Sequence, residues 1–476
     1  MGLKKNFIYN TIYQIFTLIL PMITVPYISR VLGPEGVGVY SYTNAYAQYF
    51  ILLGMVGISL YGNRQIAYTK NDKEKMSKEF WNIYALQVMT TTLSLILYIV
   101  VFVIINNNNK GLYLVQSITI LATIFDISWF FIGYEDMKSV VIRNTITKTI
   151  GVIAIFIFVK NSNDVIIYAL IMSFTMFLGQ VIMWKELKGK VYKIKPSLVF
   201  MFTHLKPSIV LFISQLAMQV YVLLDRTMLG IMTNDAQVGL YDNSQKTIKL
   251  VLALVTSLGT VMLPRMSSLY AEGKIDKFKE MIDKTFSFIT FMAIPMSLGL
   301  MAISNGFSMW FYGKEFDGIQ ILLQVGSLLI IAISWSNILG IQIMLPMKLE
   351  KQFTISVFVG AIVNFILNII LIPHINSLGT TIASVIAEFS VTIVQLYFLK
   401  KIVNIRDILK TLYKPFIGSF IMYLVISFLD MNLGVSIIFT LFEVSIGMII
   451  YITVMFFLKS DVLFLVLNEL KRKLRR

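Results

Sequence analysis

The sequence contains no cysteine and only two histidines, His204 and His374, which lie far apart in the chain. Disulfides, thiol nucleophiles and cysteine-based metal sites are therefore excluded, and we expect neither a metal centre nor a histidine proton relay. No lysine that follows a glycine is itself followed by serine or threonine, so the phosphate-binding loop of ATP hydrolases is missing as well. These absences predict a protein that uses no cofactor.

Charged residues are also scarce. They make up 14% of the chain, against 57% hydrophobic residues and a mean hydropathy of +0.77, whereas a soluble globular protein has about a quarter charged residues. The connections between apolar segments have roughly ten residues each, which is too few for an extramembrane domain. We therefore expect nearly the whole chain to lie in lipid, and a soluble enzyme is excluded.

Long apolar segments of roughly 20 to 25 residues recur about fourteen times along the chain. Each segment is long enough to cross a hydrocarbon core of about 30 Å as an α-helix. The sequence therefore predicts an all-α integral membrane protein with about fourteen transmembrane helices. The expected spans are residues 7–32, 39–63, 80–105, 111–134, 139–159, 165–184, 207–232, 240–263, 282–304, 319–346, 352–373, 378–399, 415–430 and 435–458.

Lysine and arginine are concentrated in every second gap between these segments, as at Lys73, Lys188 and Lys401. Short basic loops stay on the cytoplasmic side, so both termini are expected in the cytoplasm. The net charge of +16 is spread among these loops rather than gathered on one face, which argues against a nucleic-acid partner. It favours membrane lipid as a partner, because the cytoplasmic leaflet is anionic.

The end of the sequence has a different pattern. Leucines recur there at helical spacing and are followed by basic residues: Leu463, Leu467, Leu470 and Leu474, with Lys471, Arg472, Lys473, Arg475 and Arg476. This pattern predicts an amphipathic helix on the cytoplasmic leaflet, with a frayed basic tail as the alternative.

An internal repeat relates the two halves of the chain. Residues 37–41 resemble residues 238–242, and an arginine follows each segment at the same distance. The repeated units start and end on the same side of the membrane, so we predict two six-helix lobes in parallel repeat. The expected parts are an N-terminal lobe (1–184), a cytoplasmic linker (185–206), a C-terminal lobe (207–399), and two further helices with the tail (400–476).

A charge inside a membrane span costs several kcal/mol and is by default a candidate functional group. The first such group is Asp126, Arg143 and Lys148, on two neighbouring spans. Asp126 and Lys148 are expected about 12 Å into the bilayer, where they can face one another. They are predicted either to couple transport to an ion or to lock the two helices as a structural salt bridge.

The second group is Asp225 and Arg226, followed on the next span by Asp242, Lys246 and Lys249. The last three share one helical face, so Asp242 can pair with Lys246 or with Arg226. Lys249 has no acid at helical spacing and is expected to attract an anionic head group that enters a cavity between the lobes.

Other candidates stand apart from these groups. Arg30 is the first-lobe counterpart of Arg226, and it is either a second cargo-binding cation or a side chain that reaches the outer interface. Glu388 is a candidate for ion coupling or for neutralising Lys249, as is Glu443. Pro21 and Pro26 interrupt the first span and favour a bending gate, although proline is common in membrane helices.

Three segments resemble a known family. They are residues 126–136 (DISWFFIGYED) with the following 141–144 (VIRN), residues 225–230 (DRTMLG) with 238–241 (VGLY), and residues 26–34 (PYISRVLGP). Together they are similar to the polysaccharide transporter family, the Wzx-type flippases of lipid-linked O-antigen and capsule repeat units. The resemblance covers essentially the whole chain and implies a fold like that of the multidrug and toxin extrusion transporters.

The same resemblance implies a transporter rather than an enzyme. The cargo would be an undecaprenyl-diphosphate-linked oligosaccharide, moved from the inner to the outer leaflet of a bacterial plasma membrane, with the polymerase and glycosyltransferases of the pathway as possible partners. The diphosphate would be drawn by cations such as Lys249, Arg226 or Arg30. A drug/cation antiporter of the same fold and a lipid II flippase stay open as alternatives, and a membrane-embedded polymerase is disfavoured because no large external loop is expected.

Overall fold

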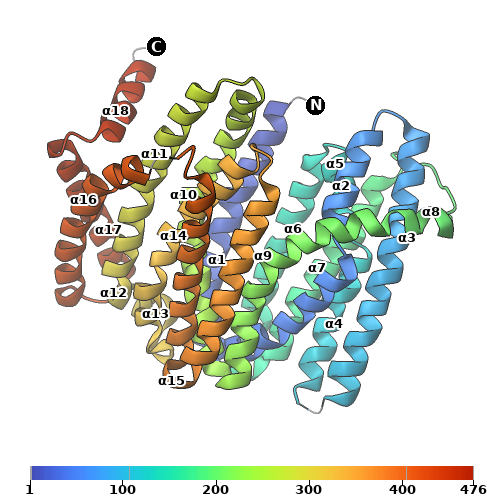
Figure 1. Ribbon diagram of the computed structural model, residues 1–476. Helices are drawn as coiled ribbons and strands as arrows, with labels where there is room; N and C mark the ends of the chain where they lie inside the picture. The colour runs from blue at the N-terminus through green and yellow to red at the C-terminus, as the bar shows by residue number, and fades with distance from the viewer. Residues whose placement is uncertain (1–2, 107, 404, 475–476) are drawn as a thin grey trace. The chain divides into compact units, whose positions relative to one another are not determined.

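The computed structural model describes residues 3–106, 108–403 and 405–474, and every regular element in these ranges is a helix (Figure 1). The predicted all-α class is confirmed for this part of the chain. Ten of the described helices are long and apolar enough to cross a membrane, or eleven if one bent helix is counted as a span. Each of the fourteen expected segments falls mainly on helix.

Two helices are far longer than the roughly 20 residues that a bilayer requires, because each joins two expected spans without a loop. Helix α1 (Leu3–Met55) breaks at Gly33, whose φ of 66° and ψ of 178° are not helical. Helix α15 (Glu350–Leu399) breaks at Ile375 and Asn376. Glycine and asparagine tolerate the positive φ that such a sharp corner needs. The sequence gaps expected at 33–38 and 374–377 are therefore corners within helices.

The described helices fall into two compact units. The first runs from Met1 to Gly230. After α1 it contains α2 (Ile58–Thr69), α3 (Lys73–Tyr98) continued by a π-helical stretch (Ile99–Ile105), α4 (Lys110–Ile124), α5 (Ser128–Gly133), α6 (Met137–Phe158), α7 (Val165–Leu187), α8 (Leu198–Thr203) and α9 (Leu205–Met232).

The second unit runs from Ile231 to Arg476. It contains α10 (Asp235–Ala271), α11 (Ile275–Ala302), α12 (Ser304–Tyr312), α13 (Ile319–Gly326), α14 (Leu328–Asn337) with a π-helical stretch (Ile338–Met344), α15, α16 (Ile405–Asn432), α17 (Ile437–Phe457) and α18 (Asp461–Leu474). The short helix α12 was not expected from the sequence. The division into two six-helix lobes and a linker stays a prediction.

The helix is interrupted between α4 and α5, and a buried glutamine hydrogen-bonds to the backbone at this interruption. Gln87 on α3 donates through Nε2 to the carbonyl oxygens of Thr123 (2.7 Å) and Asp126 (2.8 Å). Its Oε1 accepts the indole N–H of Trp129 at 2.9 Å. Trp129 in turn lies against Gly62 of α2, where an added Cβ would come within 2.5 Å of the indole ring. The motif at 126–136 therefore serves helix packing in this unit.

We predict that Gln87→Leu destabilises the protein. The substitution removes the shortest donor contact from both carbonyl oxygens and leaves the indole N–H of Trp129 with only its 3.1 Å contact to the Asp126 carbonyl. Each lost hydrogen bond costs about 0.5–1.5 kcal/mol. A fall in the temperature of unfolding of the purified protein, relative to Gln352→Leu on α15, would measure the effect. An unchanged unfolding temperature would show that water or another group satisfies the break.

The segment between α7 and α9 lies along α3 through backbone hydrogen bonds. The indole N–H of Trp81 donates to the carbonyl of Tyr192 at 2.7 Å, and the Tyr192 N–H donates to Ser77 Oγ at 2.8 Å. The Ser197 N–H donates to Asn82 Oδ1 at 2.8 Å. The residues predicted as a linker are thus attached to the first unit over much of their length.

Two side-chain contacts also hold this segment against the first unit. Lys190 pairs with Asp136 at 2.5 Å. Burial raises the pKa of Asp136, but the hydrogen bonds from Lys190 and Ser139 outweigh burial and hold that pKa below its usual range. His204 shares a 2.8 Å hydrogen bond with the Tyr61 hydroxyl, and burial lowers the pKa of its imidazole.

The basic tail forms the helix α18 that the leucine spacing predicts. Leu463 is buried, and Leu467 packs against the same cluster of α11, α16 and α17 side chains. The side chains of Leu470 and Leu474 lie outside the described residues. Part of the apolar face of α18 thus packs on the protein itself, and its position on the leaflet stays a prediction.

Candidate functional site

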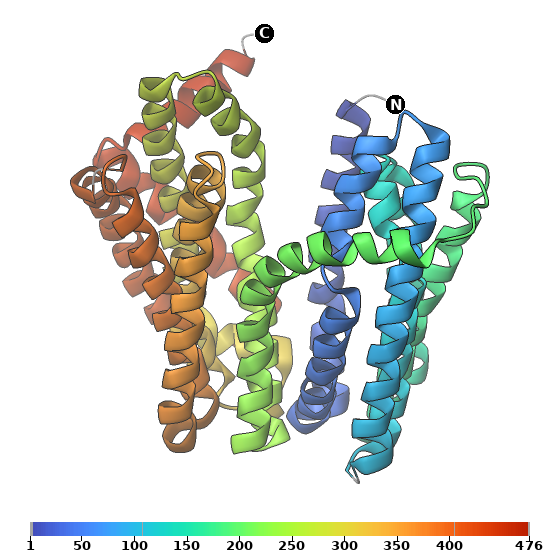
Figure 2. The same cartoon turned by 45° about the vertical axis from the view of Figure 1, so that its right-hand side comes forward.

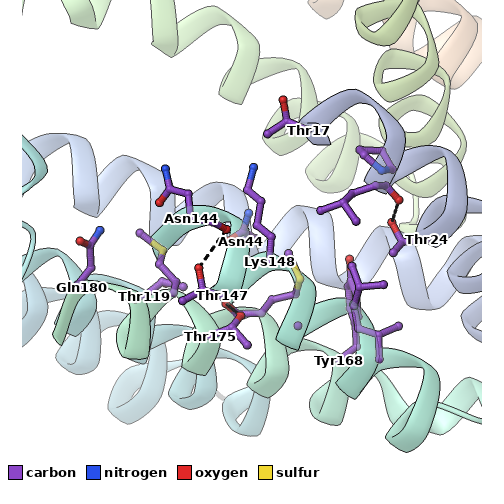
Figure 3. A pocket seen from close by; sticks show the side chains of 18 of the residues that line it. Thr17, Thr24, Asn44, Thr119, Asn144, Thr147, Lys148, Tyr168, Thr175 and Gln180 are labelled. Carbon is purple, nitrogen blue, oxygen red and sulfur yellow. Dashed lines mark hydrogen bonds between the residues drawn. The ribbon is translucent and has the colours of Figure 1, made fainter. Parts of the chain in front are cut away.

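A cavity of about 500 Å³ opens within the first unit, between α1, α4, α6 and α7 (Figure 3). Its size is that of a typical small-molecule site. Its polar lining is provided by hydroxyls, amides and two cations: Thr17, Thr24, Tyr40, Asn44, Gln48, Thr119, Arg143, Asn144, Thr147, Lys148, Tyr168, Thr175 and Gln180. Such a lining inside a bundle of membrane helices can hydrogen-bond a polar cargo that lipid cannot solvate.

Arg143 of α6 is the buried cation of this cavity, with 8% of its surface exposed. Its Nη1 donates to Gln180 Oε1 of α7 at 2.6 Å, while the buried Nε–H has no hydrogen-bond partner. Gly179 makes room for the side chain, since a Cβ there would lie 3.3 Å from Arg143 Cδ. A guanidinium with a free donor is suited to hold an anion at this point.

Lys148, which the sequence places in the same group, lies at the exposed side of the cavity. Figure 3 shows its side chain and that of Asn144, one turn earlier on α6, extending in the same direction. The ammonium lies 5.3 Å from the ring centroid of Tyr13, a cation–π contact that leaves its hydrogen-bond donors available.

The expected pairing of Asp126 with Lys148 does not occur. Helix α4 ends at Ile124, so Asp126 lies in the break between α4 and α5, within the candidate span Lys110–Gly133. Its Oδ1 accepts the N–H of Ser128 at 2.8 Å. Asp126 therefore holds the start of α5. It interacts electrostatically with Arg143, without a direct ion pair.

The two arms of α1 contribute different sides of the cavity. Pro21 lines it from the first arm, and Tyr40, Asn44 and Gln48 line it from the second. Proline removes the hydrogen bond to the carbonyl four residues earlier, which weakens the helix at the cavity. Pro26 is half-buried and is not among the lining residues. Gating by these prolines stays a prediction.

Tyr42, Tyr46 and Tyr49 lie on one face of the second arm and contact one another instead of lining this cavity. The hydroxyls of Tyr42 and Tyr46 are 3.1 Å apart, and Tyr46 packs against Phe102 with tilted rings whose centroids are 4.7 Å apart. The Tyr49 hydroxyl meets Thr227 Oγ1 of α9 at 3.3 Å. These rings join α1 to its neighbours in the first unit.

The cluster on α10 contains an ion pair. Lys246 Nζ lies 2.7 Å from Asp242 Oδ2, as the spacing predicts, and 3.3 Å from Asn243 Oδ1. Asp242 is buried and Lys246 is half-exposed, so the pair is close to neutral and Lys246 is a weaker anion site than the sequence suggests. Lys249, one turn further on, is exposed and interacts with another residue of the structure.

The remaining sequence candidates lie in separate places. Arg30 is exposed on α1 before the corner at Gly33, and Arg226 is half-buried on α9. Asp225 is buried beside Tyr49, with which it interacts electrostatically. Glu388 is buried on α15. Each of these four residues has an interaction partner in the structure, and none lines the cavity of the first unit.

The site candidates chosen from the sequence do not include Gln180, Asn144, Asn44 and Gln48, which line the cavity beside the predicted cations. A signal was present, because Asn44 and Gln48 are four residues apart and Asn144 follows Arg143 directly within an apolar span. Amides inside apolar helices face other protein groups or a polar cavity rather than lipid.

Apolar helices surrounding a polar, cationic cavity define a multi-pass membrane protein of the transporter class. The chain matches the family described as "Polysaccharide biosynthesis protein" over residues 3–270, and it belongs to that family. It is 25% identical over 405 residues to the "Putative O-antigen transporter" of Escherichia coli (strain K12). The aligned region covers 84% of this chain and 97% of that protein. A 144-residue stretch is 24% identical to the "Lipid II flippase MurJ" of Bacillus subtilis (strain 168) and covers 29% of this chain and 26% of that protein.

Solved structures of flippases and exporters have the same fold. The inward closed conformation of lipid II flippase MurJ superposes with a TM-score of 0.78 at 16% identity, covering 96% of this chain and 99% of that one. An inward-facing multidrug resistance MATE family transporter gives a TM-score of 0.65 at 12% identity, covering 84% and 96%. The predicted MATE-like fold is therefore confirmed. The relatives are transporters and flippases, which places this protein among transporters rather than enzymes.

Proposed function

We propose that the protein flips undecaprenyl-diphosphate-linked oligosaccharide repeat units from the inner to the outer leaflet, for the synthesis of a surface polysaccharide. The observation that carries the proposal is the cavity of the first unit, in which the buried guanidinium of Arg143 lies among hydroxyl and amide groups. The O-antigen transporter named among the relatives supports the cargo class.

The chemistry of the cavity suits a glycan linked to a diphosphate. Each sugar hydroxyl costs a few kcal/mol when it is left unpaired in hydrocarbon, so threonine, tyrosine and amide side chains lower the barrier to crossing. The diphosphate adds about two negative charges, which Arg143 and Lys148 can offset. An inside-negative potential would favour outward movement of the anion by about 2.3 kcal/mol per charge per 100 mV.

The proposal keeps the cations Lys249, Arg226 and Arg30 as further contacts for the head group, and it gives Lys246 a smaller part because Asp242 already pairs with it. It also includes a plasma-membrane location with both termini in the cytoplasm, as the basic loops indicate. The polymerase and glycosyltransferases of the same pathway are proposed as functional partners.

The direct test uses purified full-length protein in liposomes with undecaprenyl-diphosphate oligosaccharide that carries a labelled sugar. We expect the label to become accessible to an impermeant reagent faster than in protein-free liposomes, and faster when the imposed potential favours outward movement of the anion. The same glycan on a monophosphate carrier should respond less to the potential, because it carries fewer charges.

The rival functions give different results in this system. A drug antiporter of the same fold would leave the labelled glycolipid unmoved and would transport a cationic dye against a pH gradient. A lipid II flippase would move lipid II in preference to the oligosaccharide carrier. Either result would contradict the proposed cargo.

A further inference from the structure

Two carboxyl groups are buried together in the second unit, near the hairpin that joins α16 to α17 (Figure 1). Asp430 lies in the last turn of α16 and is 8% exposed, and Glu443 lies about 9 Å into α17 and is 2% exposed. Helices α16 and α17 pack against each other, which brings the two carboxyl groups to the same end of the hairpin. The short helix α12 packs against both α16 and α17.

Asp430 is held at the start of α12. Its Oδ1 accepts the N–H of Gly306 at 3.0 Å, and a Cβ at Gly306 would come within 2.5 Å of the same oxygen. Only glycine therefore allows this approach. The free N–H groups of a helix N-terminus favour a negative charge, so this contact stabilises Asp430 as a carboxylate. Its Oδ2 is buried and has no hydrogen-bond partner.

Glu443 has no comparable support. Among the described residues no hydrogen bond or ion pair reaches its carboxyl group. Thr440, one turn earlier on the same face of α17, accepts the indole N–H of Trp310 at 2.7 Å, which fixes α12 against α17 at this level. Helix α12 thus contacts Asp430 at Gly306 and contacts α17 at Thr440, one turn before Glu443.

The surrounding elements supply no cation to neutralise the pair. Along α16 the nearest charged residue is Lys414, about 24 Å before Asp430. Along α11 it is Lys284, about 27 Å before the end of that helix. Helix α12 contains no charged residue, and Lys314 and Glu315 beyond it are exposed. Tyr451 of α17 donates its hydroxyl to the Phe291 carbonyl at 2.8 Å.

We propose that Asp430 and Glu443 form a proton-binding site, in which Asp430 keeps the negative charge and Glu443 takes up and releases one proton. Two adjacent carboxylates cannot both stay ionised in a buried site without a cation, and one shared proton relieves the repulsion. Among the described residues no third acid or histidine joins the pair to form a metal-ligating group. The site gives the transporter a group through which a proton gradient can act.

The test is infrared spectroscopy of the full-length protein in detergent, recorded in buffers of increasing pH. We expect one C=O stretching band of a protonated carboxyl group that persists above the pH at which an exposed glutamate loses its proton. Glu443→Gln should remove this band. Asp430→Asn should move its loss to lower pH, because the neighbouring charge that retains the proton is gone. The matched control is Asp461→Asn, whose carboxylate is 95% exposed, and it should leave the band unchanged.

The proposal is overturned if the band survives in Glu443→Gln. It is also overturned if sodium, in place of choline at constant pH, removes the band from the wild-type protein, which would identify a metal-cation site instead. Should Glu443→Gln fail to fold, the shift in Asp430→Asn decides the question. The measurement uses no cargo, so failure of the flippase assay would leave this site still testable.

Discussion

Replacing Arg143 with methionine is expected to reduce oligosaccharide flipping by at least about 30-fold. Truncating one partner of a buried, charge-assisted contact costs about 2–5 kcal/mol, and 2 kcal/mol corresponds to about 30-fold. Methionine keeps much of the volume of the side chain and removes a buried charge whose Nε–H has no partner, so the fold should tolerate the change. The measurement is the liposome assay at equal amounts of reconstituted protein.

The matched control for this variant is Lys185→Met, which removes an exposed cation from α7 outside the cavity. It should flip cargo at the wild-type rate. Arg143→Lys keeps the charge but loses the planar fork that Gln180 orients, so an intermediate rate is expected. Wild-type flipping by Arg143→Met would show that the buried guanidinium does not contact cargo and would move the anion site to other cations.

Much of the helical architecture follows from hydropathy, because a membrane leaves the backbone few alternatives. What hydropathy does not encode is where one helix bends instead of ending. The corner at Gly33 and the corner at Asn376 join expected spans without any loop, and a glycine or asparagine alone does not distinguish a corner from a turn. Helix α12 lies in the gap between the expected spans 282–304 and 319–346, and hydropathy gave no signal for a separate short helix there.

The candidate site was only partly predictable. Charge inside an apolar segment identified Arg143 and Lys148, which do line the cavity, and also Asp126, which does not. The difference for Asp126 is that α4 ends two residues before it, so its carboxyl group satisfies a backbone N–H at a helix start. Sequence spacing cannot show this, since the break depends on the Gln87 side chain from another helix.

The pair of Asp430 and Glu443 shows the same limit. Both acids were visible in the sequence, and Glu443 was considered for ion coupling. Their relation depends on Gly306, which lies more than 100 residues away and brings a helix N-terminus against Asp430. Contacts between residues so far apart in the chain come from tertiary packing, and a single sequence read alone does not reveal them.

Gly57→Ala is expected to destabilise the protein by about 2–5 kcal/mol. Gly57 separates α1 from α2 with a φ of 77°, a conformation that costs a residue with a Cβ about 1–2 kcal/mol. The first turns of α9 cross this break (Figure 2). A Cβ at Gly57 would press on the carbonyl oxygen of Ser208 and lie 2.7 Å from the nitrogen of Phe212. Backbone atoms of a packed helix cannot move aside cheaply, so overpacking adds about 1–3 kcal/mol.

The matched variant is Gly189→Ala, since Gly189 has a similar φ of 82° but nothing within 4 Å of an added Cβ. It isolates the backbone cost, so its unfolding temperature should fall less than that of Gly57→Ala. The two temperatures, measured on purified protein in one detergent, separate strain at the residue from pressure on α9. Equal falls would mean that α9 yields at this crossing, and the close approach at Gly57 would then contribute nothing to the stability of the first unit.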